Sequence, residues 1–137
     1  MNADPAVREA YVDEAKRLGF DGGMVIEPSG PTFVHVADDP ERAWEEIGPY
    51  VLYEVQTYTS FQTPGQHSLP GVHAEALDDL KRSPQYVVGT PAQVLARLRA
   101  LPPTAGVVCN PLAGGLPPAL AWPSLELLAA EVLPALT

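Results

Sequence analysis

Apolar residues recur along this chain at two different spacings, which predict helices alternating with short strands. Spacings of three and four residues, typical of a helix with one apolar face, occur at 5–18, from 40 onward, at 91–101 and in a final stretch to 136. Runs of β-branched and aromatic residues between them predict strands at 32–36, 86–88 and 106–109. This alternation predicts right-handed crossovers and a parallel sheet in an α/β fold.

Three of these helices begin with a side chain that can act as an N-cap, followed by proline. The pairs are Asp4-Pro5, Asp39-Pro40 and Thr90-Pro91. The first residue of each pair supplies an acceptor oxygen, and proline at the next position has no N–H to leave unpaired. Thr90 and Gln93 also fit a capping box. Gly19 suits the left-handed position that ends the first helix.

Prolines and glycines predict where the remaining segments bend or end. Gly48-Pro49 predicts a kink or break in the second helix, whose apolar stripe consists of Trp44, Ile47, Val51, Val55 and Tyr58. A loop is expected at 61–72, and then a short helix at 73–81 that turns Ala76, Leu77 and Leu80 inward. Pro123 and Pro134 obscure the start and end of the final helix.

The composition indicates one globular domain and limits its partners. The chain has 137 residues, 46% hydrophobic and 18% charged, which is enough to bury a single core. Its 17 acidic and 8 basic residues give a net charge of −9, which disfavours nucleic acid and anionic membrane surfaces as partners. No uninterrupted apolar run reaches about 18 residues, and no signal-peptide pattern opens the chain, so a cytoplasmic setting is expected.

Three parallel strands are few, because an open sheet of that size leaves two unpaired edges. Several sequence motifs indicate what kind of larger sheet these three strands could belong to. They are residues 39–49 (Asp-Pro-Glu-Arg-Ala-Trp, then Ile-Gly-Pro), residues 88–94 (Val-Gly-Thr-Pro-Ala-Gln-Val) and the tail 110–118 (Asn-Pro-Leu-Ala-Gly-Gly-Leu-Pro-Pro) with the helix after it. In this order the set resembles the C-terminal part of luciferase-like, flavin-dependent monooxygenases.

That resemblance implies a partial (β/α)₈ TIM barrel, with 1–137 as a single domain that supplies its last three strand–helix units. Such barrels need about 250 residues. The family binds FMN or a deazaflavin at the C-terminal face of its strands, and oxidises a small-molecule substrate with oxygen or transfers hydride. Groups that its first five strands supply have no counterpart here, so the catalytic residues stay unknown and the chain is not expected to be complete alone. Ala92 and Pro123 depart from the family's polar or charged positions.

Two turns are candidates for cofactor binding. At Gly89 and Thr90, the hydroxyl and the helix N-terminus could hold a phosphate, or the turn could be an ordinary N-cap. Asn110, Gly114 and Gly115 follow the last strand, where barrels place their sites. They could bring the backbone close to a ligand, or form a tight connection that requires positive φ.

Three further positions have a functional and a structural interpretation. His35 lies in a predicted strand, where it could line a pocket as an acid or base or could be a structural histidine. Asp38 and Asp39 could be paired carboxylates, although a loop residue and a helix cap explain them more simply. Cys109, the only cysteine, could be a reactive thiol or a small buried hydrophobic residue.

The remaining histidines and the tryptophans point to no site. His67 and His73 have no third ligand in register, so no metal site is expected. Trp44 and Trp122 are expected to pack helices rather than to stack on a flavin.

Two classes of function therefore remain. One is the C-terminal part of a flavin-dependent oxidoreductase, and the other is a non-catalytic α/β module. The module would cover its open strand edge by forming a homo-oligomer or by pairing with a chain that carries the missing strands.

Overall fold

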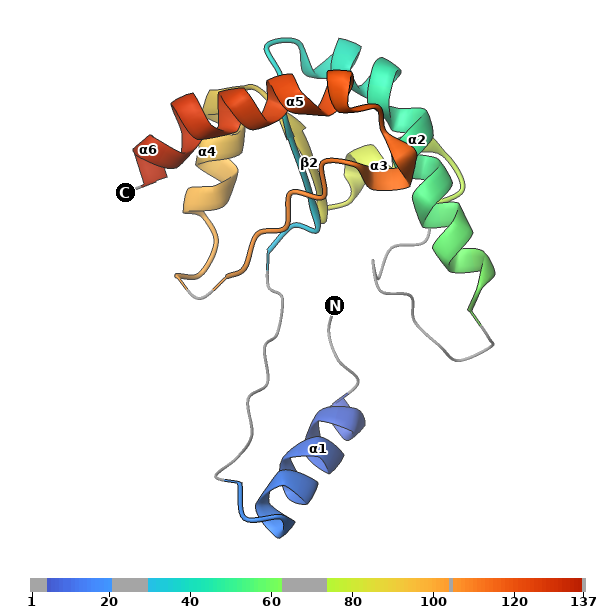
Figure 1. Cartoon of the computed structure of the whole chain (residues 1–137), viewed down its shortest axis with the longest axis vertical. Coiled ribbons are helices and arrows are strands. Elements are labelled where there is room, and N and C mark those ends of the chain that lie inside the picture. The colour runs from blue at the N-terminus through green and yellow to red at the C-terminus, as the bar shows by residue number, and fades with distance from the viewer. Residues whose placement is uncertain (1–4, 21–29, 63–73, 104, 137) are drawn as a thin grey trace.

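The computed structural model describes residues 5–20, 30–62, 74–103 and 105–136, so His67, His73 and most of the expected loop at 61–72 lie outside the described residues. The elements follow in the order α1 (Pro5–Arg17), β1 (Phe33–Val36), α2 (Pro40–Ser60), α3 (Leu77–Arg82), β2 (Tyr86–Gly89), α4 (Pro91–Arg99), η1 (Ala113–Gly115), α5 (Pro118–Leu127), η2 (Leu128–Val132) and α6 (Leu133–Leu136). The chain thus has the mixed helix-and-strand architecture that its sequence predicts (Figure 1).

The two strands form a parallel sheet, as expected. β1 pairs with β2 in a register that sets Phe33 opposite Tyr86 and Val36 opposite Gly89. The expected third strand at 106–109 is not a regular strand, but it runs beside β1 as an extended segment, called the edge segment below. The Val108 N–H donates to the Pro31 carbonyl oxygen over 3.1 Å, and the Cys109 carbonyl accepts from the Val34 N–H over 3.4 Å.

These hydrogen bonds set the order across the sheet as edge segment, β1, β2. In a barrel of successive strand–helix units, each strand would pair with the next one along the chain. Here the chain moves from β1 to β2 in one direction and then returns past β1 to the edge segment. Right-handed crossovers that run in opposite directions place their helices on opposite faces of a sheet.

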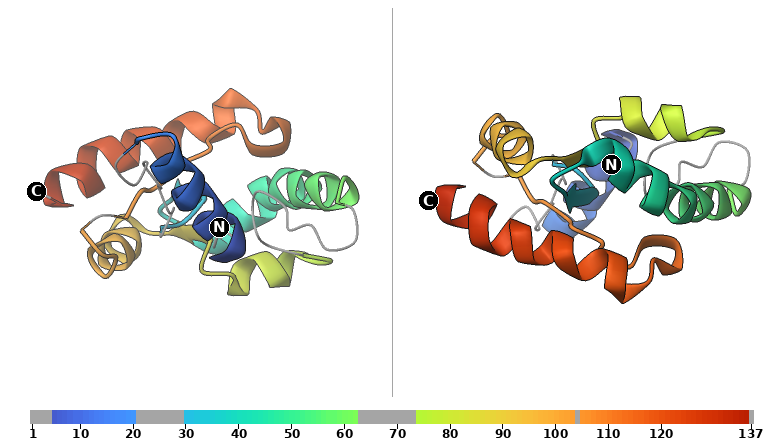
Figure 2. Two further views of the ribbon diagram at one scale, coloured as in Figure 1. Left: turned by 90° about the horizontal axis from the view of Figure 1, so that it is seen from below. Right: turned by 90° about the horizontal axis from the view of Figure 1, so that it is seen from above.

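The helices do cover both faces. Figure 2 shows the strands between α2 and α3 on one side and α4 with the C-terminal helix on the other. Phe33 and Tyr86 pack in one core cluster with residues of α2 and α3, whereas Val34 and Val36 pack in a second cluster with residues of α4 and η2. All four β1 side chains are buried.

The expectation of a partial barrel with an uncovered inner face is therefore not supported, because the described chain covers both faces of its own sheet. The physical reason lies in β1. Phe33 lies on one face with His35, and Val34 and Val36 lie on the other, so each face carries large apolar side chains. With no further strands to close a barrel, one face would stay in water unless helices packed onto it.

Helix α2 continues through Pro49 without the break that the sequence suggested. Four of its five stripe residues, Trp44, Ile47, Val51 and Val55, are buried in one core cluster on either side of Pro49, and this packing holds the helix together. Asp39 caps its start, since its Oδ1 accepts from the Arg42 N–H over 3.1 Å.

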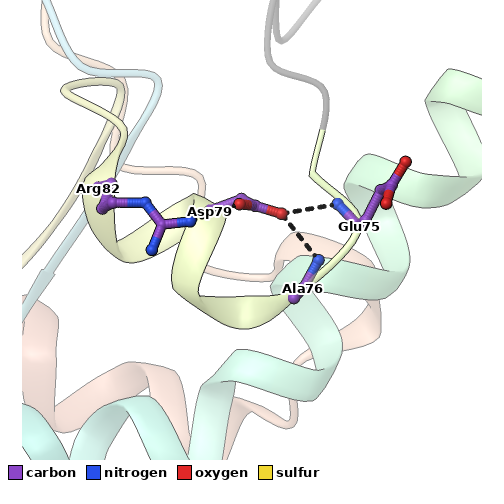
Figure 3. Close-up of polar contacts among 4 residues, drawn as sticks. All are labelled: Glu75, Ala76, Asp79 and Arg82. Carbon is purple, nitrogen blue, oxygen red and sulfur yellow. Dashed lines mark hydrogen bonds and ion pairs between the residues drawn. The ribbon is translucent and has the colours of Figure 1, made fainter.

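The short helix α3 starts at a carboxylate that the sequence pattern did not single out. Asp79 Oδ2 accepts from the backbone N–H groups of Glu75 and Ala76, each over 3.0 Å, and Oδ1 pairs with Arg82 over 2.7 Å (Figure 3). These hydrogen bonds, the one from Ala76 first, lower the pKa of Asp79. The carboxylate replaces the cap that Ala76 cannot provide.

The C-terminal helix (residues 118–136) runs on through Pro123 and Pro134, with a π-helical turn at Leu128–Val132. That turn directly precedes Pro134, whose ring would clash with the carbonyl of residue 130 in a regular α-helix. With 19 residues and a mean hydropathy of 1.3, this helix is long and apolar enough to cross a membrane. The core helix of a soluble protein can pass the same criterion, so the helix alone assigns no location.

Helix α1 forms as expected, and Gly19 after it adopts a φ of 83°. Its apolar stripe is only partly covered by the described residues. Ala15 is buried, while Val7, Tyr11 and Leu18 are exposed.

Candidate functional site

A cleft of about 440 Å³ lies at the carboxyl end of β1, between the first turns of α2 and the first turns of α5. Its walls comprise His35 to Asp39, Arg42, Ala43 and Glu46 on the β1–α2 side, and Ala119, Leu120, Pro123, Ser124 and Leu127 on the α5 side. The crossover helices α2 and α4 lie on opposite sides of the strands (Figure 2). In open α/β sheets, ligands bind outside the carboxyl ends of strands where the connections diverge in this way.

His35 is one of two buried polar residues of this cleft, and Ser124 is the other. The His35 side chain is 7% exposed, and its ring stacks on Phe33 with 6.3 Å between centroids. Burial lowers the pKa of His35 below its ordinary value, and the nearby Glu46 carboxylate only partly offsets this effect. The imidazole is therefore neutral at pH 7, with one nitrogen able to accept a hydrogen bond and the other able to donate one.

The charged residues of the cleft belong to α2 and the turn before it. Arg42 Nε pairs with Glu46 Oε1 over 2.9 Å, and both side chains are largely exposed. The Asp39 carboxylate is engaged as the cap of α2. Asp38 is exposed, and no hydrogen bond or ion pair joins it to the residues that the structure describes.

Ser124 joins the two walls of the cleft. Its Oγ accepts from the Val36 N–H over 2.7 Å, although the residues are 88 positions apart. The Val36 N–H lies at the end of β1, where the edge segment does not reach it, so the hydroxyl satisfies a buried donor that would otherwise be unpaired. This contact fixes α5 across the end of the strand.

The first predicted cofactor turn is engaged by its own helix. Thr90 Oγ1 accepts from the Gln93 N–H over 3.3 Å, and Gln93 Oε1 accepts from the Thr90 N–H over 2.9 Å. The capping box is therefore confirmed. The Gly89 carbonyl accepts from the Ala37 N–H over 3.0 Å, which ties the turn to the end of β1. A phosphate here would find the N–H groups of Thr90 and Gln93 already in use.

The second predicted cofactor turn is held by a carboxylate of α2. Glu54 Oε1 accepts from Asn110 Nδ2 over 2.8 Å, and Glu54 Oε2 accepts from the Gly114 N–H over 2.6 Å. Asn110, Gly114 and Gly115 have φ values of 40°, 58° and 82°, as the interpretation of a tight connection requires. The structure thus brings Asn110 and Gly114 together around Glu54, and no hydrogen bond between described residues joins them to Gly89 or Thr90.

Part of the donor set of each turn is thus already in use within the chain. In the first turn the N–H groups of Thr90 and Gln93 are engaged, and in the second Asn110 Nδ2 and the Gly114 N–H are bound by Glu54. Glu54 was not visible as a site residue in the sequence. Its only signal is a carboxylate beside Val55 on the edge of the apolar stripe.

The two other candidates have structural surroundings. Cys109 is partly buried, packs against the second core cluster, and has a pKa raised by burial, which favours its interpretation as a small hydrophobic residue. Trp44 is buried as expected, but Trp122 is 61% exposed and donates from Nε1 to Glu126 Oε1 over 2.8 Å. The expectation that Trp122 packs helices is therefore wrong, because most of its surface is exposed.

Among the described residues, no group of three or more histidine, cysteine, aspartate and glutamate side chains could hold a metal ion.

Comparisons of the chain with protein-family models, with curated proteins and with solved structures found no match.

Proposed function

We propose that this chain is the C-terminal part of a luciferase-like, flavin-dependent oxidoreductase and is not catalytically complete alone. The support from sequence is the ordered set of motifs at 39–49, 88–94 and 110–118. The observation that carries the proposal is that the turns after β1, β2 and the edge segment all follow the carboxyl ends of parallel segments, where α/β enzymes assemble their sites. A reduced, cytoplasmic setting belongs to the same proposal.

In this proposal the chain contributes a wall of the site rather than the cofactor's main contacts. The engaged donors at Thr90 and Gly114 are consistent with a supporting role. FMN or a deazaflavin, and a small-molecule substrate, would be bound largely by strands that this chain does not contain. The isolated chain is therefore expected to show no flavin-dependent turnover.

Site-resolved flavin titration tests the cofactor assignment. FMN and a deazaflavin are added separately to ¹⁵N-labelled chain, and backbone amide shifts are followed by NMR. The proposal expects weak, saturable shifts at Gly89, Thr90 and residues 110–115. If both compounds move only amides elsewhere, or if neither moves these amides even in a complex with a chain that carries the missing strands, the cofactor assignment is wrong.

The partial barrel is the finer part of this proposal, and it requires the edge segment to move from β1 to β2 when the missing strands are supplied. Cys109, Val34 and Val87 all pack in the second core cluster, so their side chains share one face. Val34→Cys and Val87→Cys are therefore matched probes for disulfide formation with the natural Cys109.

In the chain alone, oxidation should join Cys109 to the cysteine of Val34→Cys. In a complex with a chain that carries the missing strands, barrel order predicts the bond to the cysteine of Val87→Cys instead. If the Val34→Cys pairing persists in that complex, the barrel is excluded.

A second candidate function is a non-catalytic module that self-associates or pairs with a complementary chain. Its support is the edge segment, where Val107 and Val108 are 39% and 51% exposed on the side of the sheet away from β2. Open strand edges with apolar side chains favour pairing with another chain.

Sedimentation over a range of concentrations tests this second function. Val108→Lys should weaken self-association, while Leu112→Lys, at an exposed position outside the edge segment, should not. A chain that stays monomeric at high concentration would count against self-association.

A further inference from the structure

We propose that the cleft between β1, α2 and α5 binds a small organic amine, with its ammonium group between His35 and Asp38 and its apolar body against α5. This inference does not depend on flavin binding or on a barrel, because it rests only on groups of the described chain.

The first support is His35, a largely buried residue that lines the cleft. No hydrogen bond joins its imidazole to any described residue, and neither ring nitrogen is among the fully buried side-chain atoms that lack a partner. Water, or a ligand in the cleft, can therefore reach a ring nitrogen and bond to it. An N–H donor is suited to it, since a neutral imidazole has one unprotonated nitrogen.

The second support is the charge of the walls. The β1–α2 side presents the carboxylates of Asp38, Asp39 and Glu46 but only one cation, Arg42, whose charge is paired with Glu46. The α5 side presents no ionisable residue. An anion would therefore meet excess negative charge, whereas an ammonium group gains the Asp38 carboxylate, which pairs with no other residue that the structure describes.

The third support is the shape and polarity of the α5 wall. Leu120, Pro123 and Leu127 line it, with Ser124 fixed in place by its bond to Val36. A volume of about 440 Å³ lies within the range of small-molecule sites. The cleft thus combines an apolar wall with a few converging polar groups, as such sites commonly do.

Benzylammonium is a suitable probe, because it joins one ammonium group to one aromatic ring. Benzoate and benzyl alcohol are its matched controls, with an anionic and a neutral group on the same ring. Titration into ¹⁵N-labelled full chain at neutral pH should give saturable amide shifts for benzylammonium at residues 35–38 and 124. Equal or tighter binding of benzoate, or no saturable shift with benzylammonium, would overturn the proposal.

Variants then assign the contacts. His35→Phe should weaken benzylammonium binding by about tenfold, the effect of one hydrogen bond to a charged group, whereas His35→Gln should restore part of it. Asp38→Asn should weaken binding by a similar factor, and Asp13→Asn on α1 should leave it unchanged. Unaltered affinity in both His35→Phe and Asp38→Asn would refute the assignment.

One further variant protects the test from misfolding. If His35→Phe does not fold, as judged by circular dichroism, Leu127→Trp fills the cleft from the opposite wall without touching the polar groups. Loss of benzylammonium binding in that variant supports the cleft, and undiminished binding places the probe elsewhere and refutes the proposal.

Discussion

The carboxylate of Glu54 should contribute measurably to stability through the loop that it holds. Glu54→Gln keeps the size of the side chain but replaces one acceptor oxygen by an NH₂ group. One of the two donors, Asn110 Nδ2 or the Gly114 N–H, would then face another donor. All three groups are partly buried, so water only partly replaces the lost interaction.

The size of the effect follows from these two contacts. Hydrogen bonds to a charged group contribute about 1.5–3 kcal/mol, and one of the two survives in altered form. Loss of about 2 kcal/mol is therefore expected, with a fall in melting temperature of roughly 6–10 °C for a chain of this size.

Urea unfolding, followed by tryptophan fluorescence, measures the loss. Glu45→Gln is the matched control, because Glu45 is an exposed glutamate of the same helix, and it should change stability by less than about 0.5 kcal/mol. A double-mutant cycle with Asn110→Gly, which keeps the positive φ but removes the amide, should give a coupling of about 1 kcal/mol. Equal effects of Glu54→Gln and Glu45→Gln, or zero coupling, would refute the proposed role of Glu54.

Three further predictions follow from local geometry and burial. Gly114→Ala should destabilise the chain by several kcal/mol, because a Cβ there would overlap the Tyr50 carbonyl. Gly115→Ala, which also has a positive φ but open space around it, should cost only about 1–2 kcal/mol. Similar urea midpoints for the two variants would contradict this difference. Burial raises the pKa of Tyr86 to about 12, so stability present below pH 10 should fall by about 2 kcal/mol as pH rises towards 12. Tyr86→Phe should remove that alkaline loss in urea titrations, and an unchanged loss would exclude Tyr86 as its source. Because the pKa of His35 is lowered in the folded chain, its contribution to the free energy of unfolding is present above pH 6.5 and is lost as the pH falls through the folded pKa. His35→Gln should therefore lose less stability than the natural chain as the pH falls. Parallel curves of unfolding free energy against pH would show that other groups cause the loss.

Much of the secondary structure could be predicted from sequence because local rules decide it. Proline after a capping residue sets the starts of α2 and α4, and the run of β-branched and aromatic residues at 32–36 correctly predicts the strand β1. A kink or a break was predicted at Pro49, and the break was wrong, because residues buried on both sides of Pro49 hold α2 together. The expected helix-packing role of Trp122 was wrong as well, since most of its surface is exposed.

The site could be predicted only in outline. Its position at the carboxyl ends of parallel strands follows from the alternation of elements, and His35 was recognised as a residue that could line a pocket. Its second wall could not be foreseen, since the bond from the Val36 N–H to Ser124 joins residues 88 positions apart. The bonds from Asn110 and Gly114 to Glu54, which hold the second predicted cofactor turn, also join residues more than 50 positions apart.

The sequence by itself determined which segments become helices and strands, and that the strands run parallel. Periodicity and capping act over a few residues and need no knowledge of the rest of the chain. Only the tertiary structure decided the order of strands and the distribution of helices over two faces. The edge segment can pair with either neighbour by the same backbone hydrogen bonds, and the choice depends on which arrangement buries both apolar faces of β1.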